Sequence, residues 1–254
     1  MLKYYYRSDK GKVREINEDA VAVYEQSAEG FVLAVVADGM GGHQAGDVAS
    51  KMAIEELNKA WQNDHQDINT KKSAEKWLEN AVLQANNRVY EYALSNSSLT
   101  GMGTTIVASV CSNDFLVIAH IGDSRAYLIY QDQWKQITKD HSLVGELVRT
   151  GQLSEEDALV HPRKNVILKA LGTEKNVTPD IYSAVWEESS ILLLCTDGLT
   201  NKISDKEIHQ LLWQDCSQQT VDQLIKLAND RGGEDNITVA VINHQDKEVG
   251  DSHC

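Results

Sequence analysis

Three carboxylates in this sequence follow directly on apolar runs that are typical of buried strands. The run FVLAVVADG leads into Asp38, FLVIAHIGDS into Asp123 and SILLLCTDG into Asp197. A strand end holds a side chain on a rigid scaffold while letting it reach solvent at the rim of a sheet. If these strand ends share a rim, their charges repel one another unless a cation lies between them. Clusters of oxygen ligands suit hard or intermediate divalent ions such as Mg²⁺ and Mn²⁺.

Further acidic residues stand before strands instead of after them. GGEDNITVAVI places Asp235 just before one apolar run, and REINEDAVAVY places Glu18 and Asp19 before another. The glycines after Asp38 and Asp197 let backbone carbonyls approach an ion closely. Asp-Gly after a strand is also the ordinary signal of a turn. Its recurrence favours a metal site, but spacing alone does not show that the strands are neighbours, so the turn interpretation stays open.

The composition bounds the class of protein. With 254 residues, 42% of them hydrophobic, and only 2 prolines, we expect one domain over residues 1–243 and a polar tail over 244–254. The net charge of −14 argues against binding to nucleic acid or anionic lipid, and means that a phosphorylated substrate would require bound cations or a local arginine. We expect no membrane insertion and no signal peptide, and four dispersed cysteines fit a reducing cytoplasm.

Hydrophobic periodicity gives the elements that must position these residues. Strands are predicted at 20–24, 31–37, 103–111, 115–122, 125–131, 189–195 and 236–243, and helices from 46 to 61, around 77–92, at 204–213 and at 219–230. Strands grouped beside helices, instead of alternating with them, indicate an α+β fold with mainly antiparallel sheets. Residues 141–171 have a mixed composition and are interpreted as an insertion over the surface.

Several residues that could do chemistry are better explained by packing. His120 lies within an apolar strand, where a histidine is more often part of the core than a ligand. Cys111 and Cys195 are interpreted as small core residues, and Met102 is expected to pack. His141 lies at the start of the insertion and His161 lies within it, and neither is assigned a chemical role.

Seven motifs occur in an order that resembles a known family. They are VREINEDA, VVADGMGGHQAGDVAS, GMGTTIVAS, AHIGDSRAYL, TKDHSLV, ILLLCTDGLTNKIS and GGEDNITVAVI. Together they resemble the PP2C (PPM) family of metal-dependent protein serine/threonine phosphatases, in its compact bacterial form of the Stp/PrpC type. The resemblance covers residues 3–243. It implies two antiparallel β-sheets in a sandwich flanked by helix pairs, with a Mn²⁺ or Mg²⁺ cluster at one rim.

The resemblance also implies which residues bind two core metal ions. Asp38 matches the carboxylate that bridges both ions, and the Gly39 carbonyl matches a ligand of the second. Asp197 and Asp235 resemble ligands of the first ion. Glu18 matches the acidic residue that serves the second ion through water.

Other residues match catalytic positions of the family. Asp19 resembles the residue that orients metal-bound water, and Asp123 matches the position that, with Asp197, holds a weaker third metal ion. Arg14 corresponds to the arginine that clamps the substrate phosphate, the alternative being a solvated surface charge. Residues 142–165 match a flap beside the active site.

The sequence departs from the family at the residue after Asp38-Gly39. Many eukaryotic members carry a histidine there that is suited to protonating the leaving group, whereas this chain has Met40. We therefore expect water polarised near Asp123 to supply the proton, with His43 as the next candidate.

The reaction implied is hydrolysis of phosphoserine and phosphothreonine in proteins by a metal-activated water, in a monomeric enzyme. Its expected partners are phosphorylated proteins, among them a bacterial membrane Ser/Thr kinase and its targets. The alternative is a catalytically silent phosphatase-like module that binds a partner, but such a module should have lost ligands that this chain keeps. A specialised phosphatase for anti-sigma-antagonist proteins is a second alternative, which usually carries a sensor domain.

Overall fold

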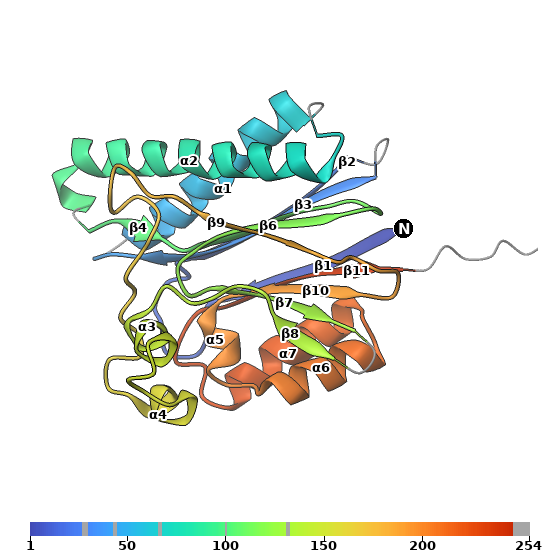
Figure 1. Ribbon diagram of the computed structural model, residues 1–254. Helices are drawn as coiled ribbons and strands as arrows, with labels where there is room; N and C mark the ends of the chain where they lie inside the picture. Colours follow the sequence, from blue (N-terminus) through green and yellow to red (C-terminus); the bar gives the residue numbers. More distant parts are fainter. Residues whose placement is uncertain (27–29, 43–44, 66–67, 100, 131–132, 246–254) are drawn as a thin grey trace, which may run out of the picture.

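The structure is a computed structural model that describes residues 1–26, 30–42, 45–65, 68–99, 101–130 and 133–245, and in it two antiparallel sheets are enclosed by helices (Figure 1). The first sheet has the strand order β1-β11-β10-β7-β8 (Leu2–Asp9, Ile237–His244, Ile191–Cys195, Arg125–Ile129, Trp134–Gln136). The second has the order β2-β3-β5-β6-β9 (Asp19–Gln26, Phe31–Met40, Ile106–Cys111, Leu116–Ile121, Asp180–Ala184), and β4 (Gly103–Thr104) pairs with β3.

Helices cover the outer face of each sheet (Figure 1). The long helices α1 (Ala45–Asp64) and α2 (Lys71–Ser95) pack on the second sheet, and α5 (Asp197–Thr200), α6 (Asp205–Gln214) and α7 (Gln218–Asp230) pack on the first. The short helices α3 (Leu143–Arg149) and α4 (Glu155–Val160) lie to one side and have no buried residues. This four-layer arrangement confirms the α+β sandwich predicted from the sequence.

Three hydrophobic cores result, one under each helical layer and one between the sheets. Alternate residues of β3 serve two of them: Leu33, Val35 and Ala37 face the helices, and Val32, Ala34 and Val36 face the other sheet. A strand that is buried on both faces has a continuous run of apolar residues, which explains why the sequence predicts β3, β5, β6 and β10. Continuing the alternation, Asp38 falls on the face between the sheets, where β3 reaches the rim.

The structure adds elements that the sequence analysis did not predict. Strands β1 and β9 lie at opposite edges of the two sheets, and β11 runs to the buried His244, one residue beyond the predicted strand. Asp197 begins a single helical turn, α5, directly after β10. The residues assigned to packing are buried as expected, since His120, Cys111, Cys195 and Met102 are at most 1% exposed.

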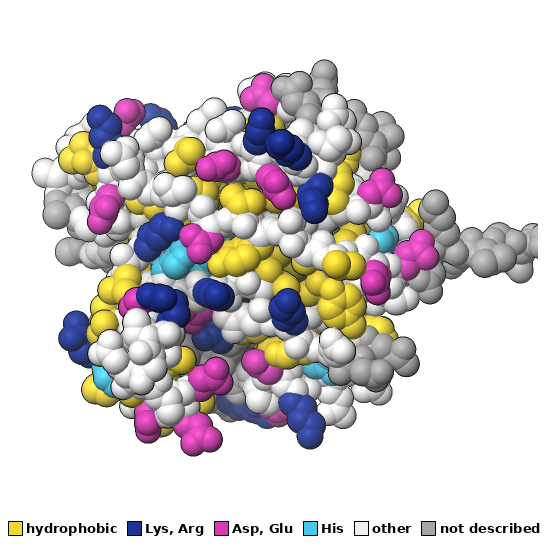
Figure 2. Space-filling view, viewed as in Figure 1, with side chains coloured by type: hydrophobic (Ala, Val, Ile, Leu, Met, Phe, Trp, Pro, Cys, Tyr) yellow, Lys and Arg dark blue, Asp and Glu magenta, His cyan; other side chains and the backbone are white. Residues whose placement is uncertain are grey.

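Figure 2 shows how charged side chains are distributed over one face of the molecule. On the face shown in Figure 2, acidic and basic side chains are intermingled, with apolar side chains between them. No helix in the described ranges is long and apolar enough to cross a membrane.

Candidate active site

The β2–β3 ladder places two of the predicted residues directly opposite each other. Asp19 and Asp38 are partners in the antiparallel register, so their side chains lie on the same face of the sheet. Asp38 is fixed by its backbone, because its N–H donates to the Thr105 hydroxyl (3.0 Å) and its carbonyl accepts from the Thr105 N–H (2.8 Å). Two carboxylates are therefore held side by side at the rim.

Asp19 connects this sheet to the other one. The Thr196 hydroxyl, which follows β10 of the first sheet, donates to Asp19 Oδ2 (2.9 Å) and accepts from the Thr238 N–H of β11 (3.0 Å). Asp19 is only 5% exposed, and its second oxygen, Oδ1, is buried and accepts no hydrogen bond from the described residues. The carboxylate is thus oriented by one oxygen and left unpaired at the other.

Asp197 and Asp235 come together because β10 and β11 are neighbours. Asp197 is the first residue of α5, and the Asn201 amide donates to its Oδ2 (3.1 Å). A Cβ atom at Gly198 would lie 2.0 Å from the Asn236 carbonyl oxygen, which no side chain tolerates. Glycine at 198 is therefore required for α5 to pack closely against the start of β11.

Glu18 and Gly39 meet on the other side of Asp38. The Gly39 N–H donates to the Glu18 carbonyl (3.1 Å), and a Cβ atom at position 39 would lie 2.1 Å from the Gly46 carbonyl oxygen. The glycine at position 39, near the end of β3, thus lets the start of α1 approach the strand. The Ser50 hydroxyl of α1 also donates to the Glu18 carbonyl (2.6 Å), which fixes the backbone of this residue.

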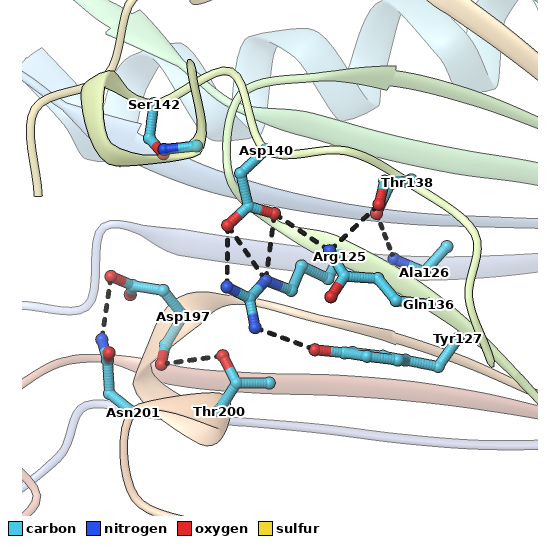
Figure 3. A network of polar contacts seen from close by, with 11 residues as sticks. Arg125, Ala126, Tyr127, Gln136, Thr138, Asp140, Ser142, Asp197, Thr200 and Asn201 are labelled. Atoms are coloured by element: carbon cyan, nitrogen blue, oxygen red, sulfur yellow. Dashed lines mark hydrogen bonds and ion pairs between the residues drawn. The ribbon is translucent and has the colours of Figure 1, made fainter. Parts of the chain in front are cut away.

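Asp123 follows β6, and the charges of Arg125 and Asp140 act on it. These two residues form the partly buried ion pair shown in Figure 3. Asp123 is 8% exposed, and its Oδ1 accepts no hydrogen bond from the described part of the chain. In β7, Arg125 donates through Nε and Nη2 to both oxygens of Asp140, at 2.7 to 3.1 Å, and through Nη1 to the Tyr127 hydroxyl (3.0 Å). The guanidinium opposes the rise in the pKa of Asp197 that burial and Asp235 cause, whereas at Asp123 the charge of the paired Asp140 outweighs that of Arg125.

Arg14 is the basic residue at the exposed side of this group. Its Nη2 donates to Asp235 Oδ2 (2.9 Å), and 48% of its side chain is exposed. An exposed guanidinium keeps further donors that can reach a phosphate.

The electrostatics show that the carboxylates act on one another. Burial, followed by the charges of Asp19, Asp197, Asp123 and Asp235, raises the pKa of Asp38 well above its ordinary value. Burial and the charge of Asp197 raise the pKa of Asp123 to about 7. For Asp19, burial and the charges of Asp197 and Asp235 outweigh the opposing effect of the nearby Thr238 and Thr196 hydroxyls and raise the pKa to about 7. The fold therefore concentrates negative charge that a cation would relieve.

The residues fit divalent cations by their chemistry. Every donor is a hard oxygen, and buried carboxylate oxygens such as Asp19 Oδ1 and Asp123 Oδ1 are costly without a partner. Among the residues that the structure describes, no three acidic, His or Cys side chains are gathered tightly enough to form a finished metal site. The carboxylates are neighbours that a cation would have to draw together.

The structure brings together all the predicted site residues: Arg14, Glu18, Asp19, Asp38, Gly39, Asp123, Asp197 and Asp235. His43 lies outside the described residues. Sequence reasoning missed Thr196 and Asn236, which contact the acidic residues across the two sheets. The only signal in the sequence was their position next to Asp197 and Asp235.

An oxygen-rich rim for cations beside an exposed guanidinium defines a site suited to hydrolysis of phosphate esters. Comparisons with known proteins make the class specific. The family described as Protein phosphatase 2C matches residues 10–234. The chain therefore belongs to the protein phosphatase 2C family, and it is an enzyme, a protein phosphatase.

Individual relatives match over nearly the whole chain. The serine/threonine phosphatase stp of Listeria innocua is 44% identical over 238 residues, which are 93% of this chain and 94% of the relative. The serine/threonine phosphatase of S. agalactiae has a solved structure with a TM-score of 0.90 and 37% identity, covering 96% of this chain and all of that one. The catalytic domain of the phosphatase PstP, solved in complex with two manganese ions, has a TM-score of 0.83 and 35% identity, covering 96% and 99%.

The raised pKa values predict that Asp38→Asn stabilises the metal-free protein. A carboxyl whose folded pKa exceeds its unfolded pKa makes the protein less stable as pH rises through the folded value. Removing one charge of the group should raise the free energy of unfolding at pH 7 by about 1–3 kcal/mol, since each pKa unit corresponds to about 1.4 kcal/mol. Urea unfolding in EDTA between pH 5 and pH 8 measures both the increase and a shallower pH dependence.

The matched control is Glu188→Gln, which removes the same charge from an exposed loop position. It should leave both quantities unchanged. A loss of stability in Asp38→Asn would mean that Asp38 supports the fold through its side chain.

Proposed function

We propose that this protein hydrolyses phosphoserine and phosphothreonine in other proteins, with Mn²⁺ or Mg²⁺ as its cofactor. The observation that carries the proposal is the group of carboxylates whose pKa values are raised by burial and by one another, beside an exposed arginine. The relatives named as serine/threonine phosphatases support the reaction, and the PstP structure with two manganese ions supports the cofactor.

In this proposal two core ions are held by the residues nearest Asp38. Asp38 would serve both ions from the end of β3, and the Gly39 carbonyl would serve the second. Asp197 and Asp235 would serve the first ion, and Glu18 would serve the second through water. The close backbone contacts at Gly39 and Gly198 support this assignment, because they bring the ends of four segments within reach of one another. Asp123, together with Asp197, would hold a weaker third ion.

When bound, the cations lower the pKa of water and offset the charge of the phosphoryl oxygens. Asp19 then has a distinct task. Its Oδ2 is occupied by the Thr196 hydroxyl, whereas its Oδ1 is free to accept a hydrogen bond from the attacking water. A carboxylate fixed at one oxygen orients that water better than a freely rotating one.

Arg14 would bind the phosphate of the substrate. Its exposed guanidinium lies at the open side of the carboxylate group, where it can donate to two phosphate oxygens at once. The leaving serine alkoxide needs a proton, and with Met40 in place of a histidine we assign its delivery to water held near Asp123.

In the cell we place the enzyme in the cytoplasm, as a monomer that reverses phosphorylation by a membrane Ser/Thr kinase and acts on that kinase and its targets. Its net charge of −14 makes cation binding a requirement for approach to such anionic substrates. Incubation with a phosphoproteome from a phosphatase-deficient strain, read by mass spectrometry, tests this setting. Loss of phosphate from tyrosine sites alone would contradict it.

The first expected outcome concerns the metal. After chelation, hydrolysis of p-nitrophenyl phosphate should be lost, and Mn²⁺ should restore it while Ca²⁺ should not, because Ca²⁺ prefers more ligands at longer distances. Steady-state kinetics with metal titration measure this. Full turnover in excess EDTA would contradict the proposal, and inactivity with every divalent ion would favour the silent binding module.

The second expected outcome concerns Arg14. Arg14→Ala should raise KM for p-nitrophenyl phosphate by about tenfold with a smaller change in kcat, since a phosphate clamp acts in both the ground and transition states. The control is Arg88→Ala in α2, whose side chain is similarly exposed at 53%. An unchanged kcat/KM in Arg14→Ala would mean that Arg14 is a solvated surface charge and does not bind the phosphate.

The third expected outcome concerns Asp123. Nitrophenolate leaves without a proton, whereas a serine alkoxide needs one, so Asp123→Ala should lower kcat far more on a phosphoserine peptide than on p-nitrophenyl phosphate, by about 10²-fold more. Asp114→Ala is the control, because Asp114 is exposed at the other end of β6. Equal losses on both substrates, with the core ions still bound, would assign the proton to another group.

A further inference from the structure

Asn236 makes an unusual set of hydrogen bonds just before β11 begins. Its side-chain amide donates to the carbonyls of Lys10 (2.8 Å) and Ile16 (3.0 Å), and its Oδ1 accepts from the N–H of Glu18 (2.8 Å). The residue is 5% exposed. Both amide hydrogens and one oxygen lone pair of this buried side chain therefore form hydrogen bonds with one segment of the chain.

That segment is the connection between β1 and β2, residues 10–18, which contains no helix or strand of its own. It carries two residues of the proposed site, Arg14 and Glu18. Other hydrogen bonds of the segment run from the N–H groups of Lys12 (2.7 Å) and Val13 (3.2 Å) to the Gly233 carbonyl. The Glu18 carbonyl also accepts from the Gly39 N–H and the Ser50 hydroxyl, as described above. The clamp by Asn236 thus holds the segment at both ends, with Arg14 between.

The same residue also fixes the carboxylate that Arg14 contacts. The backbone N–H of Asn236 donates to Asp235 Oδ1 (2.8 Å), while Arg14 donates to Oδ2 of the same group (2.9 Å). The backbone carbonyl of Asn236 packs so closely against residue 198 that only glycine fits there. Residue 198 is next to Asp197. Asn236 is consequently in direct contact with three separate parts of the site while remaining buried.

We propose that Asn236 is a positioning residue: its side chain sets where Arg14 and Glu18 stand relative to Asp235. The inference rests on the proposed function, since it names the residue that aligns the phosphate clamp with the cation site. Asp or Ser at this position could not donate to both carbonyls, which is the chemical reason for asparagine.

Asn86 provides a matched control within the chain. It is 1% exposed, its amide donates to the carbonyls of Glu174 and Lys175 (3.0 Å each), and its Oδ1 accepts from the Gly172 N–H (2.7 Å). The chemistry is the same, but the clamped loop carries none of the proposed site residues. A general effect of losing three buried hydrogen bonds should appear in both variants.

The experiment compares Asn236→Ala with Asn86→Ala in the Mn²⁺-loaded enzyme. Both should lower the melting temperature, but only Asn236→Ala should reduce kcat/KM for p-nitrophenyl phosphate, by about 10- to 100-fold and mainly through KM, as for a misplaced binding group. Its Mn²⁺ affinity, measured by calorimetry, should fall as well. Equal losses of kcat/KM in both variants, or an unchanged kcat/KM in Asn236→Ala, would overturn the proposal.

A double-mutant cycle with Arg14→Ala tests the route of the effect. If Asn236 acts by aligning Arg14, the two losses in kcat/KM should be far from additive. Full additivity would overturn the alignment of Arg14. Should Asn236→Ala not fold, Asn236→Asp keeps the volume and the acceptor for Glu18, and Asn86→Asp is its control.

Hydrogen exchange of the Glu18 amide provides a readout without turnover. Asn236→Ala should accelerate it, whereas Asn86→Ala should not, and equal protection in both would overturn the clamp. An inactive wild-type enzyme would contradict the proposed function but would leave this exchange result to decide the clamp on its own.

Discussion

The structure depends on keeping like charges together at one rim of a two-sheet sandwich. Asp19 and Asp38 face each other across one ladder, and the charges of Asp123 and Asp197 reach them from two other strand ends. Each carboxylate raises the pKa of its neighbours, so this rim destabilises the fold when no cation is present. The three hydrophobic cores offset that cost, because they fix the strands on which these residues stand. Hydrophobic packing away from the site thus supplies the stability that keeps the mutually repelling carboxylates in place.

The two sheets need a polar connection at this rim, since their shared hydrophobic core ends there. The bond from Thr196 to Asp19 joins them, and Thr196 is itself fixed by the Thr238 N–H. Behind the rim, Arg125 is bound to Asp140 and Tyr127, and its positive charge opposes the rise in the pKa of Asp197 (Figure 3). A guanidinium that is already paired cannot replace the cations, but it limits the repulsion they must overcome.

The sequence allowed prediction of strands that are buried on both faces. It did not allow prediction of residues whose hydrogen-bond partners are distant in the chain. Continuous apolar runs revealed β3 and β10, and the recurring acidic residues at their ends predicted the site. Strands β1 and β9 are edge strands with partly exposed faces, so neither shows such a run. Thr196 and Asn236 could not be found from the sequence, because a neutral polar residue beside a strand also fits a turn or a helix cap, and their partners lie 177 and 218 residues away.

Charge also determines the order of events in the proposed reaction. A chain with a net charge of −14 repels phosphoproteins, and Arg14, its exposed cation at the rim, is engaged with Asp235. Cations bound among the carboxylates would reduce the repulsion of phosphoproteins, since they would neutralise the rim. They would also release Arg14, since they would compete with it for Asp235. The affinity of the enzyme for phosphate is then linked to its affinity for metal, and the linkage acts equally in both directions. In the proposed reaction, the same carboxylates that repel one another without a cation would therefore make substrate binding conditional on the cofactor.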